Sequence, residues 1–170
     1  MDLSAEQCMV DCETLAQSPN GVICSIGAVK FNIDGIYDEF YVTIDAKDSV
    51  SYGMIIEQQT LNWWNKQNPV AFKELMKNNK PLKEALSEFS KWFGKSKPTW
   101  ACGASFDPPI IQWNYEAVGM KRPWGFWHDR CYRTMRELFP IPEPTREGTY
   151  HNALDDAKHQ TAHLLNILRS

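Results

Sequence analysis

Two acidic residues near the N-terminus are spaced so that both could bind one cation. Asp11 and Glu13 flank Cys12 in a mostly apolar segment that is expected to form a strand. Side chains alternate along a strand, so both carboxylates would project to one face while Cys12 points to the other. Neighbouring carboxylates repel each other, and a divalent cation neutralises such a pair. The alternative is a solvated strand end with two surface acids, which the triplet alone does not exclude.

A third carboxylate, Asp107, stands where a short strand is expected to pass into a helix. It follows a Gly-Ala-Ser-Phe stretch and precedes Pro108. An aspartate at such a position commonly caps the first turn of the helix, which is worth about 1 kcal/mol. The capping role and a metal-binding role are compatible, because one carboxylate oxygen can cap while the other binds a cation.

The third acidic segment opens the last helix, which is expected over residues 152–168. At about 100° per residue, this helix carries a narrow apolar stripe. The stripe is formed by Ala153, Ala157, Leu164 and Leu168. Asp155 falls on the opposite, polar side and is predicted to be a solvated acid near the helix N-terminus. Asp156 lies at the margin of the stripe, so it needs a partner, and a metal ion would supply one. His151 precedes the helix and can lie beside the same site, although a structural role is the alternative.

Three strands are expected before the first helix, and they would position the first acidic pair. Residues 8–13 and 22–31 are mostly apolar, as in central strands. Asp34-Gly35 then marks a turn. Apolar and polar side chains alternate from Phe40 to Ile44, which indicates a third strand that pairs back on the second. Three strands without an intervening helix predict an antiparallel meander.

After the third strand, helical and extended segments alternate. Helices are expected at residues 57–66, 82–93, 108–118 and 152–168. A further helix is expected to follow the strand at 127–129 and to end at residue 138, and a short one is expected to begin at Asn68-Pro69. Short strands are expected at residues 100–102 and 127–129, and prolines with a glycine make residues 139–150 a loop. This order predicts an α/β fold, a mixed sheet with helices on both faces. The whole chain, residues 1–170, is expected to form one domain.

The composition is that of an ordinary globular protein, with 43% hydrophobic and 23% charged residues. No apolar run is long enough for a transmembrane helix, and the polar N-terminus lacks the features of a signal peptide, so a cytoplasmic protein without a membrane partner is expected. The net charge of −3 argues against binding nucleic acid by broad phosphate contact. Any such role needs local contacts or metal ions. The five cysteines contain no Cys-x-x-Cys pair and are predicted to be reduced and buried.

Together, the three acidic segments resemble the motifs of the DEDDh 3′→5′ exonucleases. These motifs are Asp11-x-Glu13, Asp107 at a strand-to-helix junction, and His151-x-Ala153-x-x-Asp156. The enzymes of this family have a ribonuclease-H-like fold, whose sheet combines three antiparallel strands with parallel ones. The similarity covers nearly the whole chain and is greatest to a compact phage and bacterial subgroup, described as exodeoxyribonuclease VIII-like or 3′→5′ exoribonuclease proteins. Further similar segments are Thr14-Leu15, Ile26–Val29, Thr60–Trp64, Gly103–Asp107, Asp129–Thr134 and His151–Ala157.

The resemblance implies a chemistry and a set of site residues. The four carboxylates would hold two divalent cations, and hard oxygen ligands suit Mg²⁺ or Mn²⁺. His151 would act as the general base toward a water molecule. The partner would be single-stranded DNA or RNA with a free 3′ end, which would lose 5′-nucleoside monophosphates one at a time. The resemblance also implies residues that contact the terminal nucleotide, with Leu15 as a wedge between the last two bases. These are Thr14, Leu15, Trp64 and Phe106.

Residues 121–136 mix cationic and aromatic side chains, a combination that suits single-stranded nucleic acid. The alternative is that the arginines lie on a solvated helix face while the aromatic rings fill the core. The same ambiguity holds for Trp63-Trp64, of which at least one is expected in the core. Two other functions are compatible with the fold: a nucleic-acid-binding module with weak catalysis, and a ribonuclease-H-like endonuclease. The oligomeric state stays open, a homodimer included.

Overall fold

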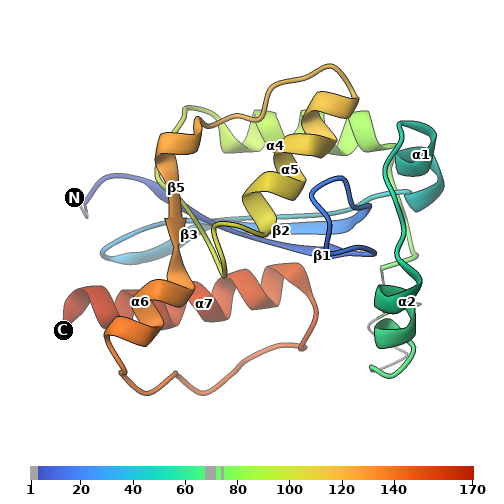
Figure 1. The fold of residues 1–170 in the computed structure, drawn as a ribbon. Helices are drawn as coiled ribbons and strands as arrows, with labels where there is room; N and C mark the ends of the chain where they lie inside the picture. Colours follow the sequence, from blue (N-terminus) through green and yellow to red (C-terminus); the bar gives the residue numbers. More distant parts are fainter. Residues whose placement is uncertain (1–3, 68–71, 74) are drawn as a thin grey trace.

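The structure is a computed structural model that describes residues 4–67, 72–73 and 75–170 (Figure 1). A five-stranded sheet with the order β3-β2-β1-β4-β5 runs through the described part of the chain. The strands are β1 (Gln7–Thr14), β2 (Ile23–Asn32), β3 (Gly35–Thr43), β4 (Thr99–Ala101) and β5 (Asp129–Cys131). The first three strands pair antiparallel, whereas β4 and β5 run parallel to β1. The predicted mixed sheet is therefore confirmed.

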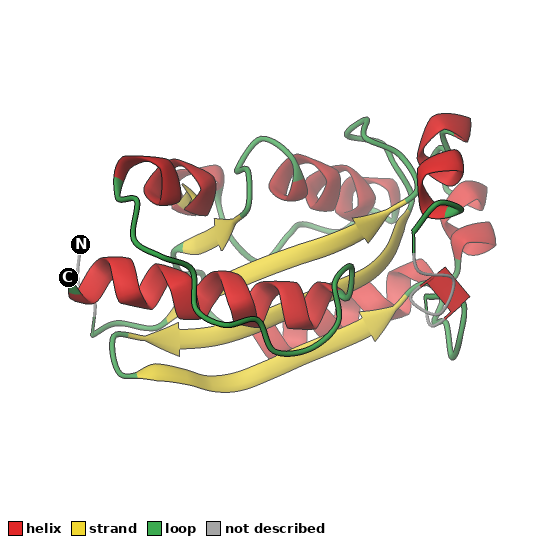
Figure 2. Cartoon of the chain, turned by 90° about the horizontal axis from the view of Figure 1, so that it is seen from below, coloured by secondary structure: helices red, strands yellow, loops and turns green. Residues whose placement is uncertain are grey.

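Helices cover both faces of this sheet, as predicted (Figures 1 and 2). The described helices are α1 (Ala46–Ser51), α2 (Gln58–Trp64), α4 (Leu82–Phe93), α5 (Asp107–Ala117), η1 (Phe126–His128, a 3-10 helix), α6 (Tyr132–Leu138) and α7 (Ala153–Arg169). The side chains of β1 alternate between two cores. Cys8, Val10 and Cys12 pack with α4 and α5 on one face, and Met9 packs with α6 and α7 on the other.

The short strand predicted at residues 127–129 is wrong in its bounds. Phe126 to His128 form the 3-10 helix η1, and the strand β5 begins only at Asp129. The backbone N–H of His128 donates to the carbonyl of Gly125, which closes a turn instead of extending the strand. The register of β5 is set by β4, because Asp129 pairs with Thr99. The short helix predicted from Asn68-Pro69 lies outside the described residues.

A close approach at Gly27 seats the last helix on the sheet. Gly27 of β2 pairs with Asp11 of β1. A Cβ atom at Gly27 would overlap the backbone of Ala153 and Leu154, in the first turn of α7. Only glycine leaves room for that contact, so this residue brings the N-terminus of α7 directly beside the acidic end of β1.

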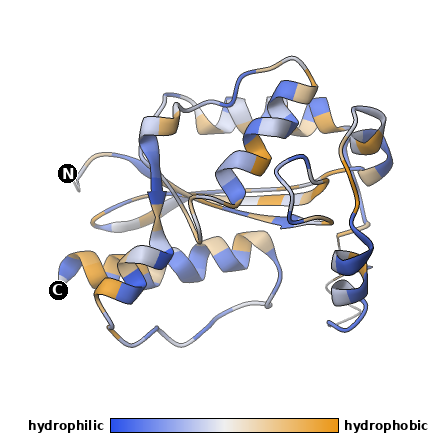
Figure 3. Cartoon of the chain, in the orientation of Figure 1, coloured by the Kyte–Doolittle hydropathy of each residue, from blue (hydrophilic) through white to orange (hydrophobic). Residues whose placement is uncertain are grey.

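The prediction of buried, reduced cysteines holds for three of the five and is wrong for Cys102 and Cys131, which are only partly buried. All five cysteines are free, and Cys8, Cys12 and Cys24 are buried. The loop predicted over residues 139–150 is present between α6 and α7, and Figure 3 shows it mostly in hydrophilic colours. Within the part of the chain that the structure describes, no helix is long and apolar enough to cross a membrane.

Candidate active site

The two carboxylates of β1 lie on the face of the sheet that α7 covers, as the alternation of a strand predicts. Glu13 is buried, and Asp11 is partly buried. The side-chain amide Nε2 of Gln160 in α7 donates to Oδ1 of Asp11 at 2.8 Å. Cys12 points to the opposite face and packs in the core with α4 and α5. Sequence reasoning did not identify Gln160, which lies one helical turn beyond Asp156 on the same side of α7.

Asp107 is the first residue of α5, and its side chain does not cap that helix. Oδ1 instead accepts a hydrogen bond from the backbone N–H of Cys12 at 3.1 Å. The parallel pairing of β1 with β4 extends only to Met9 and Trp100, so Asp107 satisfies a β1 N–H group beyond the end of that pairing. Oδ2 of Asp107 is buried and has no hydrogen-bond partner among the described residues. A buried, unpartnered carboxylate oxygen of this kind is suited to a cation.

His151 has an unusual backbone conformation that depends on its neighbours. Its φ angle is +62°, in the left-handed region that residues other than glycine rarely occupy. Its N–H donates to Oδ2 of Asp156 at 3.1 Å. The next residue, Asn152, caps α7 by accepting from the N–H groups of Leu154 and Asp155. These contacts offset a conformational cost of about 1–3 kcal/mol, the kind of strain that clusters at functional sites.

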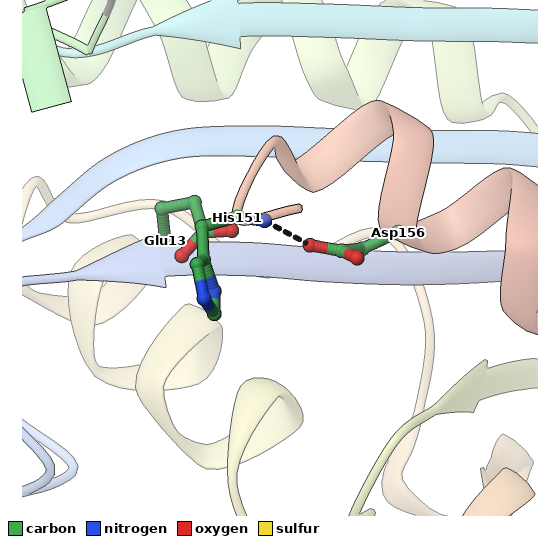
Figure 4. Close-up of side chains that lie close together, drawn as sticks. All are labelled: Glu13, His151 and Asp156. Atoms are coloured by element: carbon green, nitrogen blue, oxygen red, sulfur yellow. Dashed lines mark hydrogen bonds between the residues drawn. The ribbon is translucent and has the colours of Figure 1, made fainter. Parts of the chain in front are cut away.

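Glu13 of β1 meets His151 and Asp156, from the start of α7 and the loop before it, at this point (Figure 4). Ligand atoms of Glu13, His151 and Asp156 all lie within 4.8 Å of one another. The imidazole ring of His151 packs edge to face against Trp63, with ring centroids 4.9 Å apart, and against Trp64 at 5.9 Å. The predicted pairing of His151 with Asp156 beside the acidic strand end is therefore present in the geometry.

The carboxylates of the cluster are electrostatically unfavourable without a cation. Burial raises the pKa of Asp11 well above its usual range, and the charges of Asp107, Glu13 and Asp156 raise it further. Burial, followed by the charges of Asp156 and Asp107, raises the pKa of Glu13 to about 8. Burial also raises the pKa of Asp107 to about 7, although the hydrogen bond from Cys12 lowers it. Together with the unpartnered oxygen of Asp107, this all-carboxylate donor set fits a hard divalent cation.

Arg146 is a member of this site that the sequence did not reveal. Its Nη2 forms a salt bridge with Oδ1 of Asp156 and donates a hydrogen bond to the carbonyl of Thr149 at 3.1 Å. Its guanidinium carbon lies 4.0 Å from the ring centroid of Tyr150. Arg146 therefore supplies the partner that Asp156 was predicted to need. It lies in a loop without periodicity, so no pattern distinguishes it from a solvated arginine.

Asp155 is less exposed than the helical pattern predicts. The aspartate is partly buried, and its Oδ2 accepts a hydrogen bond from the N–H of Thr149 at 2.8 Å. The loop before α7 folds back over this side of the helix, which the periodicity of the helix cannot show. Asp155 and Asp156 still face in different directions: one bonds the loop backbone, and the other joins Glu13 and His151.

A cavity of about 360 Å³ opens beside Glu13. It is lined by Cys12, Glu13, Thr14, Gln17, Gln59, Thr60, Trp63, Trp64 and Phe106. Three of the four predicted nucleotide-contacting residues are thus at the cavity, namely Thr14, Trp64 and Phe106. Trp64 is only 1% exposed and donates from Nε1 to the carbonyl of Thr14, whereas Trp63 is 42% exposed. Trp63, which sequence reasoning left undecided, therefore offers the larger accessible ring.

Leu15 does not fit the predicted role of a wedge between bases. Its side chain is 2% exposed and packs in the core, and it does not line the cavity. Its N–H donates to the carbonyl of Val22, and its own carbonyl accepts from Glu57. These backbone bonds continue beyond the end of β1 and turn the side chain inward.

Several solved structures share this fold. The nuclease domain of 3′hExo, a DEDDh family member bound to rAMP, has 13% sequence identity and a TM-score of 0.66, over 96% of this chain and 92% of that one. Exonuclease X in complex with 5′ overhanging duplex DNA has 15% identity and a TM-score of 0.62, over 96% and 91%. An Exonuclease I from Methylocaldum szegediense has 12% identity and a TM-score of 0.64, over 96% of this chain and 40% of that one. No curated protein sequence matches the chain.

The ribonuclease-H-like sheet is the fold of the DEDDh 3′→5′ exonucleases, the class to which the sequence motifs pointed. The family model described as the 3′-5′ exoribonuclease Rv2179c-like domain matches residues 6–168. The chain belongs to this family, and it is a 3′→5′ exonuclease.

Proposed function

We propose that this exonuclease removes 5′-nucleoside monophosphates one at a time from the 3′ end of single-stranded RNA, within a single domain and with Mg²⁺ or Mn²⁺. The observation that carries the proposal is the convergence of Glu13, His151 and Asp156, with Glu13 lining a cavity whose Trp63 packs against His151. The name of the matching family, an exoribonuclease domain, favours RNA over DNA.

In this proposal the acidic residues hold the cations. Asp11, Glu13, Asp107 and Asp156 present carboxylates on or beside one face of the sheet, and burial keeps competing water away from most of them. Divalent cations held by these carboxylates would supply positive charge that stabilises the attacking and leaving oxygens of an in-line displacement. The hydrogen bond from Cys12 to Asp107 fixes the orientation of that carboxylate.

His151 takes the proton from the attacking water. Edge-to-face contacts with Trp63 and Trp64 hold the imidazole in place beside Glu13 and Asp156. As the water oxygen bonds to phosphorus, the bond to the 3′-oxygen of the preceding nucleotide breaks. The leaving 3′-oxygen takes up a proton from solvent, and the proton on His151 returns to solvent. The products are a 5′-nucleoside monophosphate and a strand with a new 3′-hydroxyl. A positioned base of this kind typically contributes about 10²–10⁴ in rate.

The cavity beside Glu13 would hold the terminal nucleotide. Trp63 and Phe106 offer rings against which a base can stack. Gln17, Gln59 and Thr60 line the same cavity with side chains that can donate to or accept from a sugar hydroxyl. Hydrogen bonding to the 2′-hydroxyl is the property that distinguishes RNA from DNA in such a site.

The test is a time course on single-stranded RNA and DNA of one sequence, labelled at the 5′ end, with Mg²⁺, Mn²⁺ or EDTA. The expected result is a ladder that shortens by single nucleotides, faster on RNA and absent in EDTA. A 3′-phosphate should block digestion, and a circular strand should stay intact. His151→Asn is the matched variant, because asparagine tolerates the left-handed backbone of residue 151 but cannot act as the base.

Each alternative function gives a different result in this assay. Cleavage of the circle would identify an endonuclease. Binding without hydrolysis under all metal conditions would identify a nucleic-acid-binding module. Full turnover in chelator would refute the role of the metal ions. Faster digestion of DNA than RNA would refute the substrate preference but leave the exonuclease assignment intact.

A further inference from the structure

A second hollow lies along α5, separate from the cavity beside Glu13. Its volume is about 960 Å³. The walls are one side of α5, with Pro109, Gln112 and Glu116, and the segment 119–129 that follows the helix. None of its lining residues belongs to the first cavity. We refer to this hollow as the η1 groove, after the 3-10 helix that forms part of its wall.

Two aromatic rings in the η1 groove are held open to solvent. Phe126 is 77% exposed and Trp127 is 65% exposed. Their ring planes meet at 77°, with centroids 5.3 Å apart. A Cβ atom at Gly125 would overlap the indole of Trp127, so this ring rests on the backbone of Gly125. The turn closed by His128 and Gly125 fixes the segment that carries both rings.

The aromatic residues of this segment thus divide into two groups. Trp124 and Tyr132 are buried, which agrees with the expectation that aromatic side chains here fill the core. Phe126 and Trp127 do not. Exposing two adjacent large rings forgoes the stabilisation that their burial would provide. Such a pair commonly marks a binding surface.

The acids that line the groove, Glu116 and Asp129, are balanced by Lys121 and Arg122, and Arg130 adds one further cation next to Asp129 in the chain. Asp129 is neutralised by Arg122, whose Nη2 lies 3.0 Å from its Oδ2. Glu116 accepts a hydrogen bond from Gln112. Lys121 is exposed at the groove, and Arg130 lies at its edge, where Nη1 donates to the carbonyls of Trp127 and Asp129.

The η1 groove extends to the first turn of α5, which also carries Asp107. Pro109, at one end of the groove, is two residues from Asp107 in the first turn of α5. Nη1 of Arg122 donates to the carbonyl of Pro108 at 3.2 Å. The exposed side chain of Arg133 donates to the carbonyl of Cys102 and lies close enough to Asp107 for its charge to act on that carboxylate.

We propose that the η1 groove binds the part of a single-stranded substrate that lies 5′ to the terminal nucleotides, with Phe126 and Trp127 stacking on bases and Lys121 contacting phosphate. The proposal rests on the proposed function, because it places the substrate's 3′ end beside Glu13. Rings that meet at 77° present faces in different directions. A flexible strand can turn successive bases toward each of them, whereas one flat protein surface cannot cover both. Aromatic stacking with local cations is the usual mode of single-strand binding, and it suits a chain whose net charge is −3.

The test compares the affinity for a short RNA of about three nucleotides with that for an RNA of about twelve, which spans a typical single-strand site. Binding is measured by fluorescence anisotropy in EDTA, so that the RNA stays intact. The wild-type protein should bind the longer RNA much more tightly. The double variant Phe126→Ala/Trp127→Ala should lose about tenfold or more in affinity for the longer RNA, because each stacked base contributes roughly five- to a hundredfold.

Two further variants make the test specific. Gly125→Ala keeps both rings and every charge but displaces the indole, so it should reduce the affinity for the longer RNA several-fold. Lys121→Ala should reduce the salt dependence of that binding, because one phosphate contact is lost. Tyr52→Ala removes an exposed ring at the end of α1 and should leave the affinity for both lengths unchanged.

The proposal is overturned if the double variant binds both lengths as the wild type does. It is also overturned if the wild type sediments as a dimer and the double variant as a monomer with unchanged affinity for the longer RNA, because the groove is then a contact between copies of the chain. Failure of the proposed function gives a different pattern. In that case no substrate is hydrolysed with Mg²⁺ or Mn²⁺, whereas the length dependence in EDTA still reports on the groove.

Discussion

The candidate active site has two halves that are held together in different ways. The sheet half consists of Asp11, Glu13 and Asp107, which strand register and burial fix in place. The loop half spans residues 146–156. It is held by the salt bridge between Arg146 and Asp156 and by the helix cap of Asn152, and it includes the strained backbone of His151. The sheet half is rigid but carries unneutralised acids. The loop half has its own cation in Arg146.

This difference indicates what each half needs from a metal ion. In the sheet half, the raised pKa values of Asp11, Glu13 and Asp107 mean that deprotonation is unfavourable without an added positive charge. In the loop half, Arg146 already balances Asp156. Metal binding should therefore relieve repulsion in one half and compete with an existing ion pair in the other.

The largest effect is expected from removing one acid in each half. Asp107→Asn and Asp156→Asn should each lower kcat by about a thousandfold or more, because transition-state stabilisation by a metal is worth several kcal/mol. Their stabilities should change in opposite directions without metal. Asp107→Asn removes a buried charge and should raise Tm, since its amide oxygen can still accept from Cys12. Asp156→Asn weakens the contact with Arg146 and should lower Tm.

Steady-state kinetics at saturating Mg²⁺ and melting curves in EDTA measure these two effects. The double variant Asp107→Asn/Asp156→Asn is the control, because its melting temperature should fall between those of the single variants. A shift of Tm in the same direction for both single variants would contradict the distinction between the two halves.

A substitution at Gly27 should disrupt the packing of the first turn of α7 against the sheet, and with it the contact between the two halves. A methyl group in Gly27→Ala would overlap the first turn of α7, and such overpacking costs about 3 kcal/mol of unfolding free energy. The displaced turn also carries Asp156 away from Glu13, so activity per folded molecule should fall. Chemical denaturation measures the stability. Ser25→Ala, two residues earlier on β2, removes an unpartnered hydroxyl and should leave stability nearly unchanged. An equally stable Gly27→Ala protein would show that α7 can shift without cost.

The pH dependence of stability should report on the sheet half. Folding raises the pKa of Glu13 from 4.5 to about 8, so the folded protein binds more protons than the unfolded chain between these values. Without metal, the contribution of Glu13 to the unfolding free energy should therefore be fully present below pH 4.5 and be lost as pH rises toward 8, by an amount on the order of 5 kcal/mol. Urea melts in EDTA at a series of pH values measure this. Glu13→Gln should flatten the curve, and an unchanged slope in that variant would exclude Glu13 as its source.

The loop half should respond to the loss of Arg146. Without metal, Arg146→Met should lower the unfolding free energy by about 1 kcal/mol, because Asp156 loses its cation. With saturating Mg²⁺, the difference in unfolding free energy between Arg146→Met and the wild type should narrow, since a bound cation then balances the same carboxylate. Thermal melts with and without Mg²⁺ measure both values. Arg136→Met, which removes an exposed pair with Glu143, is the control and should show no dependence on Mg²⁺. A gap of equal size in both conditions would mean that Arg146 and the metal do not share Asp156.

The sequence predicts the parts of the site whose positions follow the alternation of a strand or the repeat of a helix. Alternation along a strand places Asp11 and Glu13 on one face, and the helical period turns Asp156 inward, as the structure shows. Residues in loops escape this reasoning. Arg146 has no periodic partner, and Leu15 is turned into the core by backbone bonds formed after β1 ends. Asp11, Glu13 and Asp156 were therefore predictable from pattern, whereas the role of Arg146 and the inward turn of Leu15 were not.

The smallest effect is expected at Asp155, and it tests how the loop half is held. Sequence periodicity places this aspartate in solvent, but its Oδ2 accepts from the N–H of Thr149. Asp155→Asn keeps an accepting oxygen and loses only the interaction with the helix dipole, about 0.5 kcal/mol, so kcat should stay within about twofold of wild type. Asp155→Ala also removes the hydrogen bond, which is worth about 1 kcal/mol, and should loosen the loop that carries His151. Its kcat should then fall several-fold while KM changes less.

Kinetics and melting temperatures of both variants, compared with those of Asp156→Asn, test these expectations. A dead Asp155→Asn enzyme would mean that Asp155, not Asp156, belongs to the catalytic cluster. Equal rates for the asparagine and alanine variants would show that the bond to Thr149 does not position His151.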